Sequence, residues 1–63
     1  QPPMQYLASL RIQLGARMLR ESNRNVATIA LDVGYESEAA FSRAFKRMVS
    51  MPPAAWRKAQ AGA

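Results

Sequence analysis

A chain of 63 residues suffices for one small domain with a thin core, because a chain of this length buries only about 60% of its unfolded surface. It contains no cysteine, no histidine and only four acidic residues, which excludes disulfides and thiolate metal sites and leaves almost no material for acid–base chemistry. We therefore expect no enzyme activity, no catalytic residue, no metal site and no cofactor.

The charge of the chain indicates what kind of partner it binds. Nine Lys and Arg against four Asp and Glu leave a net charge of +5, which favours nucleic acid or an acidic membrane surface. No apolar run approaches the roughly 18 residues of a membrane span, and no signal-peptide pattern is present. We therefore expect no membrane partner and a cytoplasmic location.

The first predicted helix covers about residues 3–21. Pro3 suits its first turn, where a missing N–H is no loss. Placing residues about 100° apart predicts one broad apolar face. Tyr6 and Leu10 lie to one side of this face. Its members are Met4, Leu7, Leu14, Gly15, Met18 and Leu19.

Two residues of this helix are unusual for an apolar face. Arg11 falls on the apolar side, where its stem can pack while its charged group pairs with Asp32 or Glu36. Gly15 costs about 1 kcal/mol relative to alanine in mid-helix. Its missing side chain indicates that another helix crosses closely there.

A polar break over residues 22–25 separates this helix from a short second one over about residues 26–33. Asn25 is a suitable N-cap, and Gly34 is expected to end the helix by entering the left-handed region. Apolar residues recur on one face at the spacing of a helix. They are Val26, Ile29, Ala30 and Val33.

The third predicted helix runs from the cap Ser37 to about Met48, with Glu38 in its first turn near the positive end of the helix dipole. Its buried stripe is predicted to be Phe41, Ala44, Phe45 and Met48. The opposite face is predicted to hold Ala39, Ser42, Arg43 and Lys46. Pro52 and Pro53 then lead into a short fourth helix over about residues 53–59, with Ala55 or Trp56 against the core.

A short helix, a glycine turn and a capped helix with a basic outer face form the pattern of a helix-turn-helix, whose second helix enters the major groove of DNA. Each element alone has an ordinary structural explanation. Phe41 and Phe45 suit any core, Arg43 and Lys46 suit any solvated face, and a glycine often ends a helix. Their order on a basic chain without catalytic residues favours DNA binding.

Four groups of residues strengthen this interpretation. They are Tyr6, Leu7, Arg11 and Leu19; Ile29, Ala30, Val33, Gly34, Tyr35 and Ser37; residues 41–47, "FSRAFKR"; and residues 52–57, "PPAAWR". With them the chain resembles the AraC/XylS family of bacterial transcription regulators over about residues 2–58. Three positions depart from the family pattern: Ser50 stands where glycine is usual, Gly15 where alanine is favoured, and Val49 where an aromatic residue is frequent.

The resemblance implies an all-α, homeodomain-like helix-turn-helix bundle of about four helices. It implies that residues 1–63 form the C-terminal half of a DNA-binding domain with two such motifs. The linker helix would then cover about residues 3–21, the helix-turn-helix about residues 26–48, and the closing helix about residues 53–59.

The leading functional interpretation is sequence-specific binding of double-stranded DNA in a bacterial transcription regulator, with the helix Ser37 to Met48 in the major groove. Arg43 is the first choice for a base or backbone contact. Arg47 is expected to meet phosphates, as is the start of the second helix. The predicted DNA-binding residues are Ser37, Glu38, Ala39, Ser42, Arg43, Lys46, Arg47, Asn25 and Thr28.

The sequence leaves open the role of Glu38 and the function of the chain, and it predicts self-association. Glu38 either accepts a hydrogen bond from a cytosine N4 or caps the dipole and repels phosphate. The chain could instead be a helical protein-interaction module that docks RNA polymerase or a partner subunit. Tyr6 and Leu10 are also expected to mediate self-association of this fragment, because an uncovered apolar patch tends to find a partner.

Overall fold

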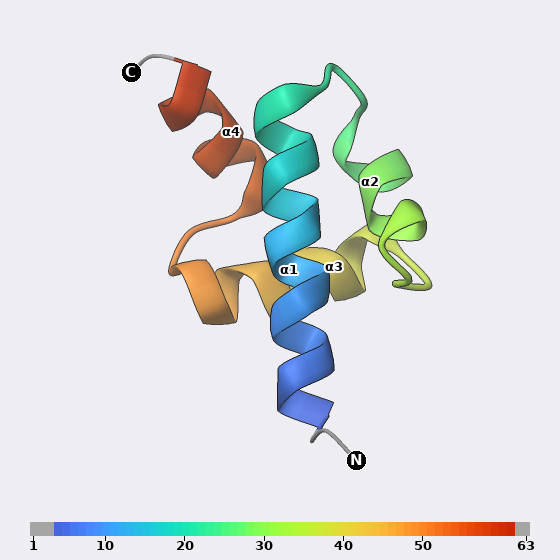
Figure 1. Cartoon of the computed structure of the whole chain (residues 1–63). Coiled ribbons are helices and arrows are strands. Elements are labelled where there is room, and N and C mark those ends of the chain that lie inside the picture. Colours follow the sequence, from blue (N-terminus) through green and yellow to red (C-terminus); the bar gives the residue numbers. More distant parts are fainter. Residues whose placement is uncertain (1–3, 62–63) are drawn as a thin grey trace.

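The computed structural model describes the backbone of residues 4–61 and the side chains of residues 7–61. The predictions for the side chains of Met4 and Tyr6 therefore lie outside the described side chains. Within the described part the chain forms four helices and no strand, which confirms the all-α prediction (Figure 1). The helices are α1 (Met4–Glu21), α2 (Val26–Asp32), α3 (Glu38–Val49) and α4 (Pro53–Ala61).

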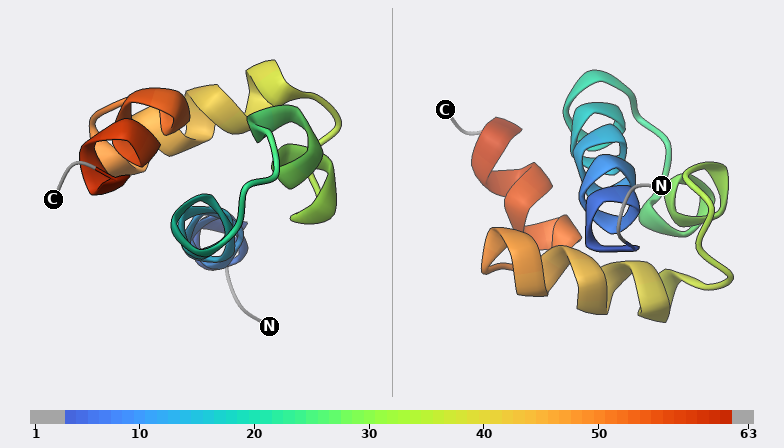
Figure 2. Two further views of the ribbon diagram at one scale, coloured as in Figure 1. Left: turned by 90° about the horizontal axis from the view of Figure 1, so that it is seen from above. Right: turned by 60° about the horizontal axis from the view of Figure 1, so that its bottom comes forward.

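Helix α1 is the centre of the arrangement, because it packs against each of the other three helices. Seen along its axis, α2, α3 and α4 form an arc around one side of α1 and leave its other side uncovered (Figure 2, left). The first turns of α1 project past α3 (Figure 1). None of the helices described is long and apolar enough to cross a membrane.

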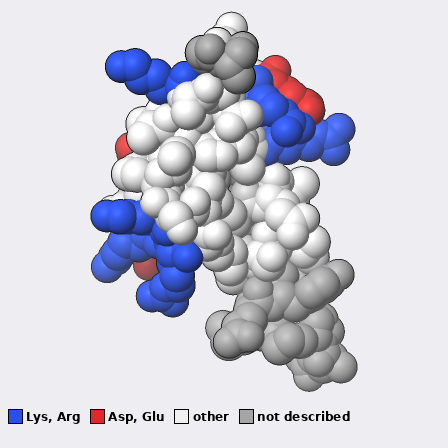
Figure 3. Space-filling model, turned by 90° about the vertical axis from the view of Figure 1, so that its left-hand side faces the viewer, with Lys and Arg blue, Asp and Glu red and all other residues white. Residues whose placement is uncertain are grey.

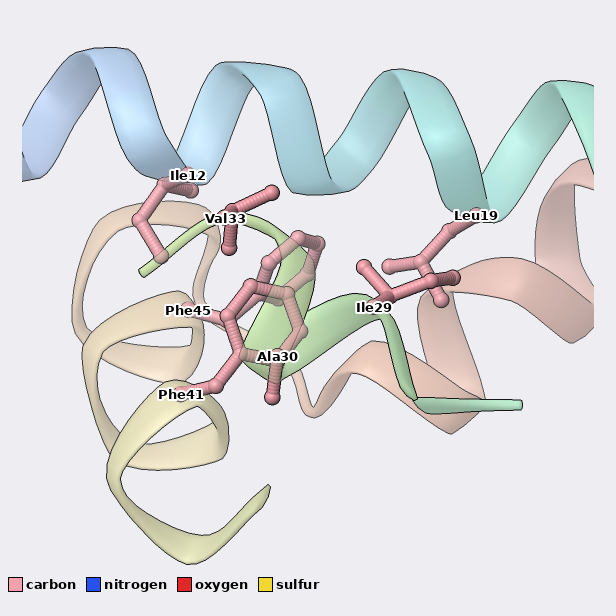
Figure 4. Close-up of a cluster of buried hydrophobic side chains, with 7 residues drawn as sticks. All are labelled: Ile12, Leu19, Ile29, Ala30, Val33, Phe41 and Phe45. Atoms are coloured by element: carbon pink, nitrogen blue, oxygen red, sulfur yellow. The ribbon is translucent and has the colours of Figure 1, made fainter. Parts of the chain in front are cut away.

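The hydrophobic core lies where α1, α2 and α3 meet (Figure 4). Its buried members are Ile12, Leu19, Ile29, Ala30, Val33, Phe41 and Phe45. The prediction of a close approach at Gly15 is confirmed, and the approaching group is the ring of Phe41. The prediction that Phe41 and Phe45 anchor α3 is also confirmed, since both are fully buried.

The predicted apolar face of α1 is partly wrong. Leu7 and Leu14 were placed toward the core but are 45% and 53% exposed, whereas Ile12, left out of that face, is only 3% exposed. The buried side follows Ile12, Gly15 and Leu19, at the i, i+3 and i+7 spacing of a helix. Leucines occupy both sides of α1, so the periodicity alone could not show which side faces the core.

The predicted caps of α2 and α3 are confirmed. The Asn25 side chain accepts a hydrogen bond from the backbone N–H of Thr28 at 2.8 Å. The Ser37 hydroxyl accepts one from the N–H of Ala40 at 3.1 Å. Gly34 has a φ of +102°, so it takes the left-handed conformation expected of it. Helix α2 ends at Asp32, one residue before the predicted end.

Two predictions at the end of α3 and in α4 need correction. Met48 is 43% exposed and does not belong to the buried stripe, whereas Val49 is half-buried against the core. Helix α4 extends to Ala61, two residues beyond the predicted end. Of the two candidates for the core contact in α4, Trp56 packs against the core and Ala55 is exposed.

The predicted ion pair of Arg11 is absent from the described residues. Asp32 instead pairs with Arg24, whose guanidinium nitrogen lies 2.6 Å from a carboxylate oxygen. The guanidinium carbon of Arg11 lies over the ring of Tyr35, 5.9 Å from its centroid. Arg11 thus has a cation–π contact, and the exposed Glu36 has no ion pair in this part of the chain.

Candidate nucleic-acid interface

Helix α3 has one face fixed in the core and one face open to solvent. Phe41 and Phe45, four residues apart, are both fully buried. Residues three and four apart lie next to each other on a helix, so the exposed residues gather on the other side. This basic face of α3, as we call it, consists of Ala39, Arg43, Lys46 and Arg47.

Aromatic rings hold α3 from behind. The ring centroid of Phe41 lies 5.6 Å from that of Tyr35 and 5.7 Å from that of Phe45. Phe45 meets Trp56 of α4 edge to face, with centroids 5.7 Å apart. Such tilted pairs add about 0.5–1.5 kcal/mol beyond the burial of their area. The helix is therefore held at both its N-terminal and C-terminal halves.

Apart from Lys58, the cations outside α3 in the described chain have partners within it. Arg17 and Arg20 both donate to Glu21, and Arg24 pairs with Asp32. The hydrogen bonds from Arg17 and Arg20 hold the pKa of Glu21 below its usual value. Arg57 donates to two backbone carbonyls. With Arg11 over the Tyr35 ring, five of the nine Lys and Arg side chains thus have partners inside the molecule.

The three cations of the basic face of α3 differ from these. Among the described residues, Arg43, Lys46 and Arg47 take part in no side-chain hydrogen bond or ion pair. Figure 3 shows a group of Lys and Arg side chains at the height of α3, apart from the groups nearer the top of that view. Unpaired cations in one place attract an anionic partner and contact its phosphates without first breaking internal pairs.

The other predicted site residues lie at different places. Glu38 is exposed in the first turn of α3. Ser42 is half-buried, so it borders the basic face and does not lie at its centre. Ser37 uses its hydroxyl to cap α3, and Asn25 uses its side-chain oxygen to cap α2. Thr28 is exposed on α2, which packs against α3.

Arg47 was assigned to phosphate contact apart from Arg43, but the structure places both on the same exposed face. The helical spacing of four residues is the signal in the sequence that places Arg43 and Arg47 on one face.

In the part of the chain described, no group of three or more acidic residues could hold a metal ion.

Comparison with known proteins places this geometry in a family. Residues 1–59 match the model of a family described as "Helix-turn-helix domain". The chain is 55% identical over 58 residues to a putative AraC-like transcription regulator of Streptomyces lividans, covering 92% of this chain and 19% of that protein. It is 43% identical over 56 residues to the HTH-type transcriptional regulator AlkR of Acinetobacter baylyi, covering 89% and 18%. The chain thus spans about a fifth of the length of these relatives.

A solved structure is also similar. It is the crystal structure of the DNA-binding domain of AdpA, a global transcriptional factor, in complex with a target DNA. The TM-score is 0.88 and the sequence identity 32%, over 94% of this chain and 53% of that one. Family model, relatives and fold agree, and the chain belongs to the AraC-type helix-turn-helix family.

Proposed function

We propose that this chain binds double-stranded DNA sequence-specifically as part of a bacterial transcription regulator, with α3 as the recognition helix. The observation that carries the proposal is the pair of faces on α3. Phe41 and Phe45 hold one face in the core, while Arg43, Lys46 and Arg47 stand unpaired on the other. The major groove of B-DNA, about 12 Å wide, admits an α-helix presented in this way.

We assign different roles to the three cations. Arg43 lies near the middle of α3, and its planar guanidinium can donate two hydrogen bonds to the O6 and N7 atoms of a guanine. Lys46 and Arg47 lie in the last turn, where they contact phosphates and fix the register of the helix in the groove. Ser42, at the border of the basic face, supplies a hydroxyl beside Arg43.

The N-terminal end of α3 supplies the remaining contacts on that helix. Ala39 is exposed and apolar, which suits contact with a thymine methyl group. Glu38 is exposed beside it and can accept from a cytosine N4. Ser37 orients this end of the helix by capping it.

The start of α2 is proposed to contact the DNA backbone. The Asn25 oxygen is occupied by the cap, which leaves its amide nitrogen free to donate to a phosphate. The Thr28 hydroxyl is exposed one turn later. Because α2 packs against α3, such contacts would hold the recognition helix over the groove.

The relatives support this role. The chain covers about half of a DNA-binding domain that was solved with its target DNA. We infer that residues 1–63 are the C-terminal half of an equivalent domain, with α1 as linker helix, residues 26–48 as the helix-turn-helix, and α4 as closing helix. A single motif offers half the base contacts, so this chain alone is expected to bind DNA weakly, with Kd values of roughly 10⁻⁴–10⁻⁶ M and only a small preference for the sequence that it selects.

The uncovered side of α1 supports a second proposal, self-association. Leu7, Leu10 and Leu14 form an exposed leucine stripe at the i, i+3 and i+7 positions of α1, and they are 45%, 38% and 53% exposed. The arc of the other helices leaves this side of α1 open (Figure 2, left). We infer that two copies of the fragment pack through this stripe.

The DNA proposal is tested by charge-matched variants. The double substitution Lys46→Ala and Arg47→Ala removes the two cations of α3 that are assigned to phosphates, and Arg17→Ala with Arg20→Ala removes two cations from α1. Affinity for duplex DNA is measured over a series of salt concentrations. The α3 variant should lower the slope of log K against log[salt] by roughly two, while the α1 variant leaves it nearly unchanged. Equal effects of the two variants, or binding that does not depend on salt, would contradict the proposal.

A further inference from the structure

The side chain of Arg57 links α4 to the C-terminal end of α1 by hydrogen bonds. The Nε atom of Arg57 donates to the carbonyl of Leu19 at 2.9 Å, and its Nη2 atom donates to the carbonyl of Ser22 at 3.1 Å. No other hydrogen bond within the described part of the chain joins residues more than eight positions apart. The helices are otherwise held together by apolar packing, which is non-directional.

The acceptors of Arg57 are groups that a helix end leaves unsatisfied. The last four carbonyls of a helix have no partner within it and carry partial negative charge. The Met18 carbonyl is satisfied by the backbone N–H and the hydroxyl of Ser22. Arg57 satisfies the next carbonyl, that of Leu19, and also the one just beyond α1. A guanidinium can reach both because its donors form a rigid planar fork, which a lysine lacks.

This link closes a ring of contacts around the core. Trp56, next to Arg57, packs edge to face on Phe45 of α3. Phe45 packs on Phe41, whose ring lies against Gly15 of α1. The ring therefore passes from the end of α1 through α4 to α3 and back to the middle of α1. Arg43 lies on α3 between the two phenylalanines in sequence, on the exposed face.

We propose that Arg57 is a positioning residue for DNA recognition, which fixes the angle of α3 on α1 through Trp56 and Phe45. The inference rests on the proposed function of α3. Rotation of α3 about its packing on Phe41 would move the charged ends of Arg43 and Arg47 away from their places in the groove. Base contacts depend on this angle, whereas charge attraction to phosphates does so much less.

The test compares Arg57→Gln with the control Lys58→Gln, because both remove one positive charge from adjacent positions of α4 and Lys58 has no partner among the described residues. The probes are a duplex that the unchanged chain selects from a random pool and a duplex of random sequence. Arg57→Gln should weaken binding to the selected duplex on the order of tenfold, about the effect of one lost base contact. Its binding to the random duplex should match that of Lys58→Gln.

A second measurement does not depend on DNA. Residual dipolar couplings of the amides report the angle between α1 and α3, and the fluorescence of Trp56, the single tryptophan, reports its contact with Phe45. Arg57→Gln should change both, and Lys58→Gln neither. If the unchanged chain selects no duplex, the proposed function fails, while these couplings still decide whether Arg57 sets the angle.

Arg57→Lys separates positioning from stabilisation, because it keeps the charge and stem but loses the fork. It should keep its helical circular dichroism and show the same change in angle, with a smaller loss of affinity. An unchanged angle in Arg57→Gln would overturn the proposal, as would a changed angle with unaltered affinity for the selected duplex. Loss of helical structure in both Arg57→Gln and Arg57→Lys would also overturn the proposal, because Arg57 would then be needed for the stability of the whole fold.

Discussion

The ring of Phe41 lies against the backbone of Gly15, so that a Cβ atom at position 15 would be 2.6 Å from Cε1 and 2.7 Å from Cζ of that ring. Real Cβ contacts are never this short, so a side chain at position 15 requires the ring to move. Phe41 is fully buried, and the rings of Tyr35 and Phe45 pack on it. The ring therefore has little freedom to yield.

Gly15→Ala is the first prediction. Alanine would add about 1 kcal/mol of helix propensity, but overpacking a filled core costs about 1–3 kcal/mol. We expect a net loss of about 1 kcal/mol in the free energy of unfolding, measured by urea denaturation. We expect this loss of stability even though the AraC/XylS pattern described above favours alanine at position 15.

The matched test of the cause is the same substitution in a Phe41→Leu background. Without the aromatic ring there is room for the methyl group, and Gly15→Ala should become neutral or stabilising. The coupling energy of this double-mutant cycle should be about 1–2 kcal/mol. An alanine that stabilises both backgrounds equally would show that the ring gives way freely.

Phe45→Ala tests which face of α3 is buried. Phe45 is fully buried between Phe41 and Trp56, so its truncation should cost about 3–5 kcal/mol, a large share of the stability of so small a domain. Met48→Ala is the control on the same helix. Met48 is 43% exposed, so its substitution should stay within about 0.5 kcal/mol. Thermal unfolding of both variants decides, and similar losses would mean that α3 is rotated.

The elements with strong local signals could be predicted from the sequence. Asn25 and Ser37 cap helices because their short polar side chains reach a backbone N–H two or three residues ahead, whatever the rest of the fold does. Gly34 ends α2 because glycine enters the left-handed region without steric conflict. The four helices and the anchors of α3 followed from these local rules and from spacing.

The side of α1 that faces the core could not be predicted in the same way. Ile12 and Leu7 are equally apolar, and only the arrangement of three other helices makes the first buried and the second exposed. The partner of Arg11 has a similar cause. Asp32 lies within reach of Arg24, whose position in the loop before α2 depends on the packing of that helix. The packing of the helices on one another decides which side of α1 is buried and which cation pairs with Asp32. The periodicity of the sequence carries no information about that packing.

Ser50→Gly is predicted to stabilise the fold. Ser50 follows α3 with a φ of +74°, in the left-handed region, and its N–H donates to the carbonyl of Lys46 at 2.9 Å. This conformation costs a residue with a side chain about 1–2 kcal/mol, a cost that glycine avoids. Glycine also loses more conformational freedom on folding, which cancels part of that gain. We expect a gain of about 0.5–1 kcal/mol, with a rise in Tm of roughly 4–8 °C per kcal/mol.

Ser50→Ala is the control for that prediction. Alanine also has a Cβ, so it should suffer the same strain and bring no comparable gain. Calorimetry of both variants would separate relief of backbone strain from loss of the serine hydroxyl. An equal rise in Tm for alanine and glycine would contradict the strain at this position.

Arg43→Ala tests the proposed base contact. Removal of a bidentate contact to guanine should cost about 1–3 kcal/mol of affinity for a selected duplex. Stability should be nearly unchanged, because Arg43 is exposed and has no partner in the described chain. Fluorescence anisotropy titration measures the loss, with Arg17→Ala as the control that removes one cation from α1. Affinity equal to that of the unchanged chain would remove Arg43 from the site.

The exposed leucine stripe of α1 carries the last prediction. The fragment was expected to self-associate around Tyr6 and Leu10, and Leu10 is 38% exposed in the structure, while the side chain of Tyr6 is not described. Sedimentation velocity over a concentration series should show a rising sedimentation coefficient, because pairing removes apolar area from water at about 25 cal/mol per Å². Leu10→Glu with Leu14→Glu should keep the fragment monomeric. Leu31→Glu is the control, since Leu31 is 62% exposed but lies on α2. If the unchanged fragment sediments as a monomer at every concentration, the stripe is not a contact between copies of this chain.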